Sequence, residues 1–387
     1  MSNSVVVIGG LHHNTLGVLR SLGIAGIKDT LLILIGHGLD FISRSKFIKK
    51  KNIIKLDSDN ELLDLLLKIG PEFTSKPVVI SSSDSSIAVI DNHYETLKKF
   101  FLLPNANDCQ GEINKLMDKC GQNKIAEQCG LIFPETIQGN SENDIASWNT
   151  YPSIIKPIES ILGSKADIKI CNNKNELTES IRMYDGRSFL VQPFVDKDYE
   201  FQLIGCSLEH GQKIILPGFT KKIRHSLKCN TGFLQYKDIK KVEGPDLIQN
   251  VSNFLKFIKY EGLFSIEFLR TKDGKNLFLE INLRSDGNVF CVTESGVNLP
   301  YCWVLYKNGK KIANSDIKHE ISFMCELEDF KFCIGAHKNM LLWMWQFINS
   351  SHSVFNIKDL SPFFHKFAPM LKNGLMKVPK KIAKIFS

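Results

Sequence analysis

The chain has 387 residues, of which 43% are hydrophobic and 23% charged, and its formal net charge is +8. This composition excludes disordered and collagen-like proteins, and the length suffices for two or three domains with separate cores. The ten cysteines are scattered singly with no Cys-x-x-Cys pair, which argues against a zinc site or a disulfide framework and predicts a reducing, cytoplasmic environment.

Residues 1–106 alternate strand-like and helix-like segments, which predicts a Rossmann-like domain with a small parallel sheet. Met1 is followed almost at once by a strand-like run, so we expect no signal peptide, and the apolar runs are too short to span a bilayer. The expected strands cover residues 5–8, 30–35, 53–56 and 77–81, and the expected helices cover 14–22, 59–69 and 87–101. The dinucleotide pattern G-x-G-x-x-G is absent, so NAD is not expected.

The ligand crevice of such a sheet lies at the carboxyl ends of its strands. The sequence places His12, His13 and Asn14 after the first strand and Asp84 after the fourth, and we predict that these four side chains bind substrate. Structural roles remain open for all of them, because histidines are often satisfied within the fold and Ser83-Asp84 could cap the next helix.

Residues 107–310 are predicted to form a second domain of the α+β class. A helix over 115–129 ends at Gly130, and strands at 153–156, 166–171 and 188–191 surround a helix over 174–184. The segment 200–283 is mostly strand-like, with one helix over 246–260. Residues 311–387 form a C-terminal extension with a basic tail.

A hairpin over residues 264–284 is the most informative segment of the sequence. Asp273-Gly274 between alternating apolar runs predicts a two-residue turn. That turn places Glu267 directly opposite Glu280, with Asn282 and Arg284 on the same face. The other face would carry Ile266, Phe268, Leu279, Ile281 and Leu283.

Two opposed carboxylates repel each other unless a cation lies between them. Glu267, Glu280 and the amide oxygen of Asn282 are suitable ligands for Mg²⁺ that bridges to phosphate oxygens. Arg284 beside the metal would neutralise a transferring phosphoryl group, so we predict that it is catalytic. The alternative is a wet, charged strand face that binds no metal.

The hairpin resembles the end of the nucleotide site in the ATP-grasp superfamily, with Glu267 on one strand and the motif Glu-x-Asn-x-Arg at 280–284 on the next. Other landmarks follow in the family's order over residues 115–288. Asp118-Lys119 resembles its first lysine segment, and residues 152–157 around Lys156 resemble its second lysine strand. Residues 189–195 resemble the hinge that holds adenine, and Glu200 the acid near the ribose.

The resemblance implies an N-terminal preATP-grasp domain followed by a two-subdomain ATP-grasp fold with its hinge near residues 189–196. It extends to the preceding domain of carboxylate–amine ligases, among them D-aspartate ligases of peptidoglycan. It implies Mg-ATP as the cofactor, with Mn²⁺ as a substitute. The residues expected to bind ATP are Lys119, Lys156, Gly163, Ser164, Gln192, Pro193, Phe194, Val195 and Glu200. The phosphate-covering loop, residues 159–165, has one glycine where the family usually has several.

The basic segment 220–225 lies before the hairpin, and we predict that Arg224 and Lys222 hold the substrate carboxylate or its acyl phosphate. A solvated basic loop is the alternative. The expected function is ATP-dependent amide or peptide bond formation through an acyl phosphate, and a catalytically silent ATP-binding module is the alternative. The partners would be a small or precursor-linked carboxylate and an amine such as an amino acid. Nucleic acid is not expected, and an oligomer is compatible with the sequence.

The tail mixes lysines with Phe363, Phe364 and Phe367, as an interfacial helix does. We therefore consider weak contact with an anionic membrane at the inner face. The alternative is that these side chains pack on the protein, and Pro369 and Pro379 would interrupt a long helix.

Overall fold

The computed structural model describes residues 4–158, 168–184, 186–226, 229–244, 246–313 and 315–374. Its first unit is a parallel sheet in the order β3-β2-β1-β4. The strands are β1 (Val5–Gly10), β2 (Thr30–Ile35), β3 (Ile53–Leu56) and β4 (Val78–Ser81). Strands β1 and β2 are almost wholly buried, as expected for apolar strands covered on both faces. The predicted Rossmann-like domain is therefore confirmed.

The helices of this unit are α1 (His13–Ile24), α2 (Leu62–Ile69), α3 (Asp84–Asn92) and α4 (Tyr94–Leu97). The single helix predicted over 87–101 is wrong in its length. It is interrupted at His93, whose φ of −124° and ψ of 24° are not helical and separate α3 from α4. Ser58 and Glu61 form a capping box ahead of α2.

The second unit is a large, mainly antiparallel sheet in the order β15-β14-β10-β12-β13-β16-β17. Short strands β5 (Asn105–Ala106) and β11 (Lys213–Ile215) pair with β14 and β10. The remaining strands are β10 (Lys197–Leu208), β12 (Gly218–Ser226), β13 (Cys229–Asp238), β14 (Tyr260–Thr271), β15 (Asn276–Asn282), β16 (Ile321–Met324) and β17 (Ser351–His352).

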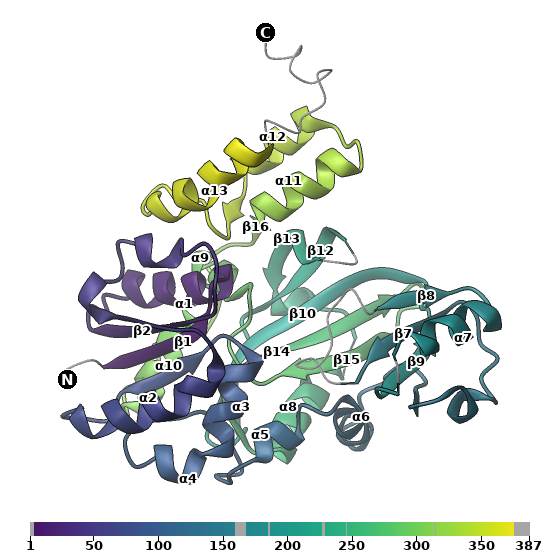
Figure 1. Cartoon of the computed structure of the whole chain (residues 1–387), viewed down its shortest axis with the longest axis horizontal. Helices are drawn as coiled ribbons and strands as arrows, with labels where there is room; N and C mark the ends of the chain where they lie inside the picture. The colour runs from purple at the N-terminus through teal and green to yellow at the C-terminus, as the bar shows by residue number, and fades with distance from the viewer. Residues whose placement is uncertain are drawn as a thin grey trace.

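Helices α5 (Glu112–Lys115), α6 (Lys119–Gln128) and α8 (Leu247–Phe257) lie beside this sheet (Figure 1). The helix predicted over 115–129 is thus two helices, because residues 116–118 turn before Asp118 caps α6. Gly130 follows α6 with a φ of +79°, a left-handed conformation that glycine adopts without strain.

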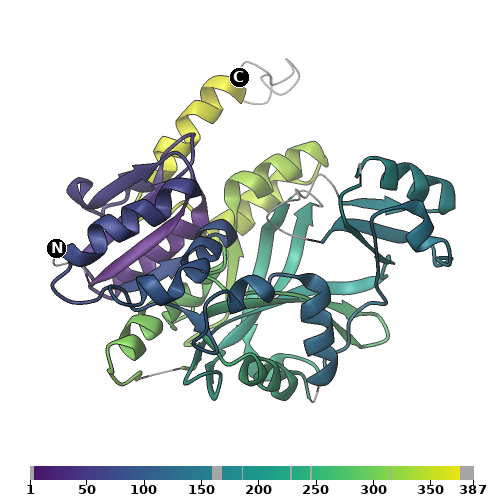
Figure 2. The same ribbon diagram turned by 60° about the horizontal axis from the view of Figure 1, so that its bottom comes forward.

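A third, smaller sheet forms a separate lobe, visible at the right of Figure 2. It has the order β6-β9-β7-β8 and carries α7 (Lys174–Arg182). Its strands are β6 (Ile137–Gly139), β7 (Ser153–Pro157), β8 (Lys169–Cys171) and β9 (Phe189–Pro193). Trp148, Ile155, Leu177 and Phe189 belong to its own buried core, so the lobe is an independent packing unit.

The C-terminal part carries α9 (Val289–Glu294), α10 (Leu299–Lys307), α11 (Glu326–Gly335), α12 (Met340–Ile348) and α13 (Ser361–Gly374). Strand β16 pairs with β13, so residues beyond 311 extend the large sheet. In α13, Phe363 packs against the core, and the ring of Phe367 stacks on the ring of Phe363. Phe364 is exposed. Within the described ranges, none of the helices has the length and apolarity needed to cross a membrane.

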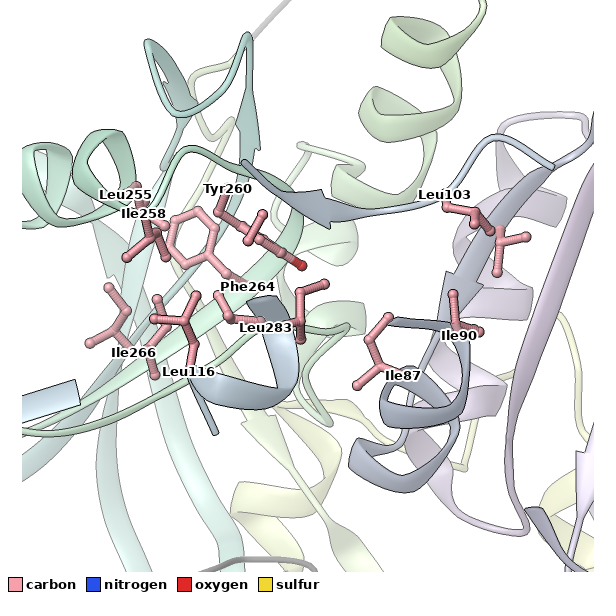
Figure 3. Close-up of a cluster of buried hydrophobic side chains, with 14 of the residues drawn as sticks. Ile87, Ile90, Leu103, Leu116, Leu255, Ile258, Tyr260, Phe264, Ile266 and Leu283 are labelled. Carbon is pink, nitrogen blue, oxygen red and sulfur yellow. The ribbon is translucent and has the colours of Figure 1, made fainter. Parts of the chain in front are cut away.

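One buried cluster joins the first unit to the large sheet. Figure 3 shows Ile87, Ile90 and Leu103 on one side and Phe264, Ile266 and Leu283 on the other. The hairpin that carries the predicted metal ligands is therefore anchored through its apolar face to the same core as the parallel sheet.

Candidate active site

The hairpin of β14 and β15 pairs Glu267 with Glu280, and Ser265 with Asn282, as the sequence predicts. The predicted two-residue turn is wrong. Arg270 pairs with Asn276, the Thr271 backbone N–H donates to Lys275 O at 2.9 Å, and Gly274 has a φ of +85°. The connection is therefore one residue longer than predicted.

A β-bulge after Glu267 compensates for the longer turn, because Phe268 pairs with Phe278 and leaves Leu279 as the extra residue. Phe278 is consequently fully buried, and its ring lies 6.0 Å from that of Phe268. Leu279, which strict alternation assigns to the apolar face, is only half-buried. The extra residue in the turn and the extra residue at the bulge offset each other before Glu280. Glu267 and Glu280 therefore lie opposite each other as predicted.

Lysines surround the paired glutamates. Lys119 Nζ lies 3.4 Å from Glu280 Oε2, and Lys222 Nζ lies 3.5 Å from Glu267 Oε2 and 3.0 Å from Glu200 Oε2. Burial acts to raise the pKa of Glu280, but Lys119 and Lys156 lower it below its ordinary value. Burial likewise acts to lower the pKa of Lys222, but Glu267 and Glu200 raise it. Glu280 is thus held in the charged form that a metal ion requires.

Lys119 is the first residue of α6. Asp118 does not pair with it but caps the helix, accepting hydrogen bonds from Cys120 N at 3.3 Å and Gly121 N at 2.7 Å. Gln122, one turn later, donates to Leu116 O and Ile281 O and accepts from Ile281 N. This side chain, which sequence reasoning missed, fixes α6 and hence Lys119 against β15.

Lys156 lies on β7 of the small lobe and is half-buried. Burial and the nearby charge of Lys119 lower its pKa to about 8, against the opposing effects of Glu280 and Glu267. It makes no ion pair with a described residue. Two ammonium groups next to each other, one of them desolvated, form an environment that a polyphosphate would stabilise.

The predicted adenine hinge connects the small lobe to the large sheet. Gln192 is buried and donates from Nε2 to Thr136 Oγ1 at 2.8 Å, and Phe194 N donates to Pro152 O at 2.8 Å. Phe194 is partly exposed, and Pro193 and Val195 are half-buried. Glu200 also pairs with Lys197. The predicted Gly163 and Ser164 lie outside the described residues.

Arg284 links the hairpin to the parallel sheet. Its Nε lies 3.0 Å from Asp84 Oδ1, and its Nη2 lies 3.3 Å from Asn282 Oδ1. Burial acts to lower the pKa of Arg284, but Asp84 and Asp286 raise it. Asp84 is the first residue of α3, and its neighbour Ser83 is the N-cap. Asp84 thereby presents its carboxylate to the hairpin rather than capping the helix.

His12, His13 and Asn14 lie at the start of α1. His12 Nδ1 lies 2.6 Å from Asn14 Oδ1, and His13 Nε2 lies 3.5 Å from Cys325 Sγ. A Cβ placed on Gly287 would come within 2.7 Å of Asn14 Oδ1, so the loop after Arg284 lies against these residues. Burial lowers the pKa values of His12 and His13, which are therefore neutral near pH 7.

Further polar residues that sequence reasoning missed complete this region. Gln202 donates from Nε2 to Glu267 Oε1 at 2.9 Å and accepts from Asn288 Nδ2. Asp286 accepts from Ser265 Oγ and Asn288 N. Gln202 lies two residues after Glu200, and residues at this spacing share one face of a strand. This spacing is the pattern in the sequence that could have identified Gln202 as a site residue.

Arg224 is placed differently from the other predicted residues. It pairs through Nε and Nη2 with the buried Asp329, at 2.8 and 2.7 Å, and contacts Gln346 Oε1. A β-bulge between Lys222 and Arg224 separates it from the lysine that contacts Glu267. Because its guanidinium already holds a carboxylate in a bidentate contact, binding a substrate carboxylate would require this pair to open.

One pocket connects the parts of the site. It is lined by Asp84 and Asn114 at one end, by residues 116–119 and Gln122 along α6, and by residues 280–283 of β15. Among the described residues no three His, Cys, Asp or Glu side chains cluster as a complete metal site. The two carboxylates and the Asn282 amide therefore fit a magnesium ion that takes its remaining ligands from phosphate and water.

The parallel first unit, the large antiparallel sheet and the small lobe confirm the fold that the resemblance to ATP-grasp proteins predicts. No family model matches the chain.

Particular proteins share this fold. The N5-carboxyaminoimidazole synthetase of Staphylococcus aureus, solved with ADP, superimposes with a TM-score of 0.65 at 12% identity, over 87% of this chain and 86% of that one. The L-amino acid ligase of Bacillus licheniformis superimposes with a TM-score of 0.61 at 14% identity, over 83% and 79%. In sequence, the D-alanine--D-alanine ligase of Aquifex aeolicus is 26% identical over 174 residues, which cover 43% of this chain and 58% of the relative.

Proposed function

We propose that this protein is an ATP-dependent carboxylate–amine ligase that forms an amide bond through an acyl phosphate and releases ADP and phosphate. The observation that carries the proposal is the direct opposition of Glu267 and Glu280 with Lys119, Lys156 and Lys222 around them. Two opposed carboxylates with several amines around them suit a magnesium-bound polyphosphate. Three proteins of similar fold or sequence are carboxylate–amine ligases or synthetases by name, which supports the class.

Each group has a role in this proposal. Glu267, Glu280 and Asn282 would hold Mg²⁺, or Mn²⁺ in its place, which when bound neutralises phosphate charge. Lys119 on α6 of the second unit and Lys156 on β7 of the small lobe would bind ATP phosphates as point charges. The segment 192–195 would contact adenine, and Glu200 the ribose.

The substrate would lie between Arg284 and the strand ends of the first unit. Its carboxylate oxygen attacks the γ-phosphorus, and the bond to ADP breaks while Arg284 stabilises the charge on the transferring group. The amine nitrogen then attacks the acyl carbon, phosphate leaves, and the amine loses a proton. Asp84, His12, His13 and Asn14 would orient the two substrates, which we propose are a small or precursor-linked acid and an amino acid or similar amine, in the cytoplasm.

The test is phosphate release from Mg-ATP in the presence of mixtures of amino acids and small carboxylic acids, with products identified by mass spectrometry. We expect release that depends on one acid and one amine together, with ADP rather than AMP as the second product. We expect Glu280→Gln and Arg284→Ala each to reduce it at least about a hundredfold with an unchanged circular dichroism spectrum. Turnover near the wild-type rate in either variant would contradict the assigned roles.

A catalytically silent ATP-binding module is the competing function, and the single glycine in the phosphate-covering loop favours it. It predicts ATP binding by calorimetry without phosphate release for any pair of substrates. Binding that is lost in Lys156→Ala, combined with absent turnover, would favour the module over the ligase.

A further inference from the structure

Helix α12 has its apolar side facing solvent. The side chains that point outward are all large and hydrophobic, with exposed fractions between 51% and 78%: Leu341, Leu342, Met344, Trp345 and Ile348. Helices at a protein surface normally turn polar residues to water and apolar residues to the core. Such a contiguous patch on one short helix marks an interaction surface. Figure 1 shows α12 beside α11 and α13, at an edge of the molecule away from the sheets.

Polar contacts on the other side of α12 fix this orientation. Trp343 donates from Nε1 to the buried Asp329 at 2.9 Å, and Gln346 accepts a hydrogen bond from Arg224 at 3.0 Å. Asn339 caps the helix by accepting from Leu341 N and Leu342 N. Turning the apolar side inward would break these contacts and take from the buried Asp329 its hydrogen bond with Trp343, which is costly. The exposed apolar face is therefore built into the fold.

The charge of the segment that follows the start of α11 is mostly positive, although the exposed Glu328 of α11 pairs with Lys331. From residue 330 to residue 387 the sequence contains a single acidic residue, Asp359, against nine lysines. Asp359 is buried and bound to Arg20, so it does not contribute to the surface. Lys338 precedes the helix directly, and Lys331 and Lys358 are exposed nearby in the sequence. An exposed apolar helix whose neighbours carry more lysines than acids matches a surface with an apolar interior and negatively charged headgroups.

We propose that the outer face of α12 docks on an anionic phospholipid surface, with the helix lying in the plane of the interface. The apolar side chains would enter the acyl boundary, and Trp345 would sit at headgroup depth, where its amphipathic ring is favoured. The lysines would contact lipid phosphates. The surface would hold the enzyme near its membrane without a spanning helix.

Two other occupants fit the charge poorly. A symmetric contact between two copies would place the same lysines of each copy opposite each other. The chain's own residues 375–387 carry four of these nine lysines and no acid, so they do not complement the lysines around α12. An acidic protein partner would fit the charge, but a convex helix with a fully apolar outer face has no groove or polar group to orient one.

Flotation of the full-length protein with vesicles tests the proposal. Phosphatidylcholine vesicles containing phosphatidylglycerol should bind it, and pure phosphatidylcholine vesicles should bind it at least about tenfold less. The double variant Trp345→Ser/Ile348→Ser should lose binding at least about tenfold, because it removes two large side chains from the interface. The control Ile24→Ser/Phe257→Ser removes two side chains of similar exposure, 51% and 56%, from other helices and should bind as the wild type does.

Lys338→Gln/Lys358→Gln should weaken binding to the anionic vesicles and flatten its salt dependence. Equal flotation of wild type and the Trp345/Ile348 variant would overturn the proposal. So would retained binding in that variant together with complete loss on replacing Lys377, Lys380, Lys381 and Lys384 by Gln. A wild-type dimer in sedimentation velocity that the Trp345/Ile348 variant converts to a monomer would show that a second copy occupies the face.

Discussion

The charge balance of the site depends on Lys156. Its ammonium group is removed from water on β7, and Lys119 adds a second positive charge nearby, so its pKa falls to about 8. The positive charges of both lysines lower the pKa of Glu280. In the protein without nucleotide, Lys156 is therefore mostly charged at pH 7 but loses its proton above about pH 8, whereas a bound triphosphate would stabilise its charged form. Nucleotide binding and protonation of this residue are coupled.

This coupling predicts how ATP affinity depends on pH. A bound phosphate raises the pKa of Lys156, so binding takes up a proton wherever the free protein has lost one. Affinity should be near its full value at pH 7 and fall above pH 8, with a dissociation constant about tenfold higher at pH 9 than at pH 7. Titration calorimetry with a non-hydrolysable ATP analogue in buffers of different ionisation enthalpy would measure both effects.

The control is Lys156→Arg, because a guanidinium keeps its charge throughout this range. Its affinity should be nearly independent of pH between 7 and 9, whatever its absolute value. A wild-type dissociation constant that stays flat up to pH 9, or equal slopes in the two proteins, would contradict the proposed contact of Lys156 with phosphate.

At the level of elements, the site depends on how α6 is attached to β15. Gln122 bridges them, with hydrogen bonds to Leu116 O at 2.8 Å, Ile281 O at 3.0 Å and Ile281 N at 2.9 Å. Ile281 lies between Glu280 and Asn282, so this bridge positions Lys119 relative to the two proposed metal ligands on β15. The bulge at Leu279 has the same kind of effect, because it sets which residue of β15 faces Glu267.

Replacing Gln122 by Leu should destabilise the fold and weaken ATP binding together. Leucine fills a similar volume but leaves three buried backbone groups without partners, which we expect to cost roughly 2–4 kcal/mol in the free energy of unfolding. Urea denaturation gives the stability, and calorimetry gives the affinity. Gln128→Leu is the matched control, since the exposed Gln128 closes the same helix. Equal behaviour of the two variants would show that the bridge is unimportant.

In the whole molecule, the first unit and the C-terminal helices are joined by a buried ion pair. Arg20 of α1 donates to Asp359 Oδ2 at 2.9 Å and to the backbone oxygens of Ser353, Val354 and Asp359. Asp359 also accepts from Ser45 Oγ and Lys46 N. Both side chains are buried, so each charge depends on the other. This contact holds the proposed membrane-docking segment against the domain at the start of the chain.

Arg20→Met should therefore lower the free energy of unfolding by about 3–5 kcal/mol, because it leaves the Asp359 carboxylate buried without its countercharge. The double variant Arg20→Met/Asp359→Asn should recover part of the loss, with a coupling of at least about 1 kcal/mol in a double-mutant cycle. Lys331→Met, which removes an exposed pair with Glu328, should change stability by less than about 1 kcal/mol. An additive cycle would mean that the buried pair does not act as one unit.

Local patterns in the sequence sufficed for the strands of the parallel sheet and for the opposition of Glu267 and Glu280. Burial on both faces makes strands such as β2 continuously apolar, and alternation on one strand marks its polar face whatever the rest of the chain does. Helix ends were less legible, because the breaks at His93 and at residues 116–118 depend on packing rather than on local propensity.

Contacts between distant segments were decided by the tertiary structure alone. The pairing of Arg224 with Asp329, the bridge made by Gln122 and the link from Arg284 to Asp84 join residues 105, 159 and 200 positions apart. The residue types allow many partners at such separations, and only the packed fold selects one. The orientation of α12 was also decided by the tertiary structure. Its apolar sequence is typical of a buried helix, but the polar contacts of Trp343 and Gln346 turn its apolar face to solvent.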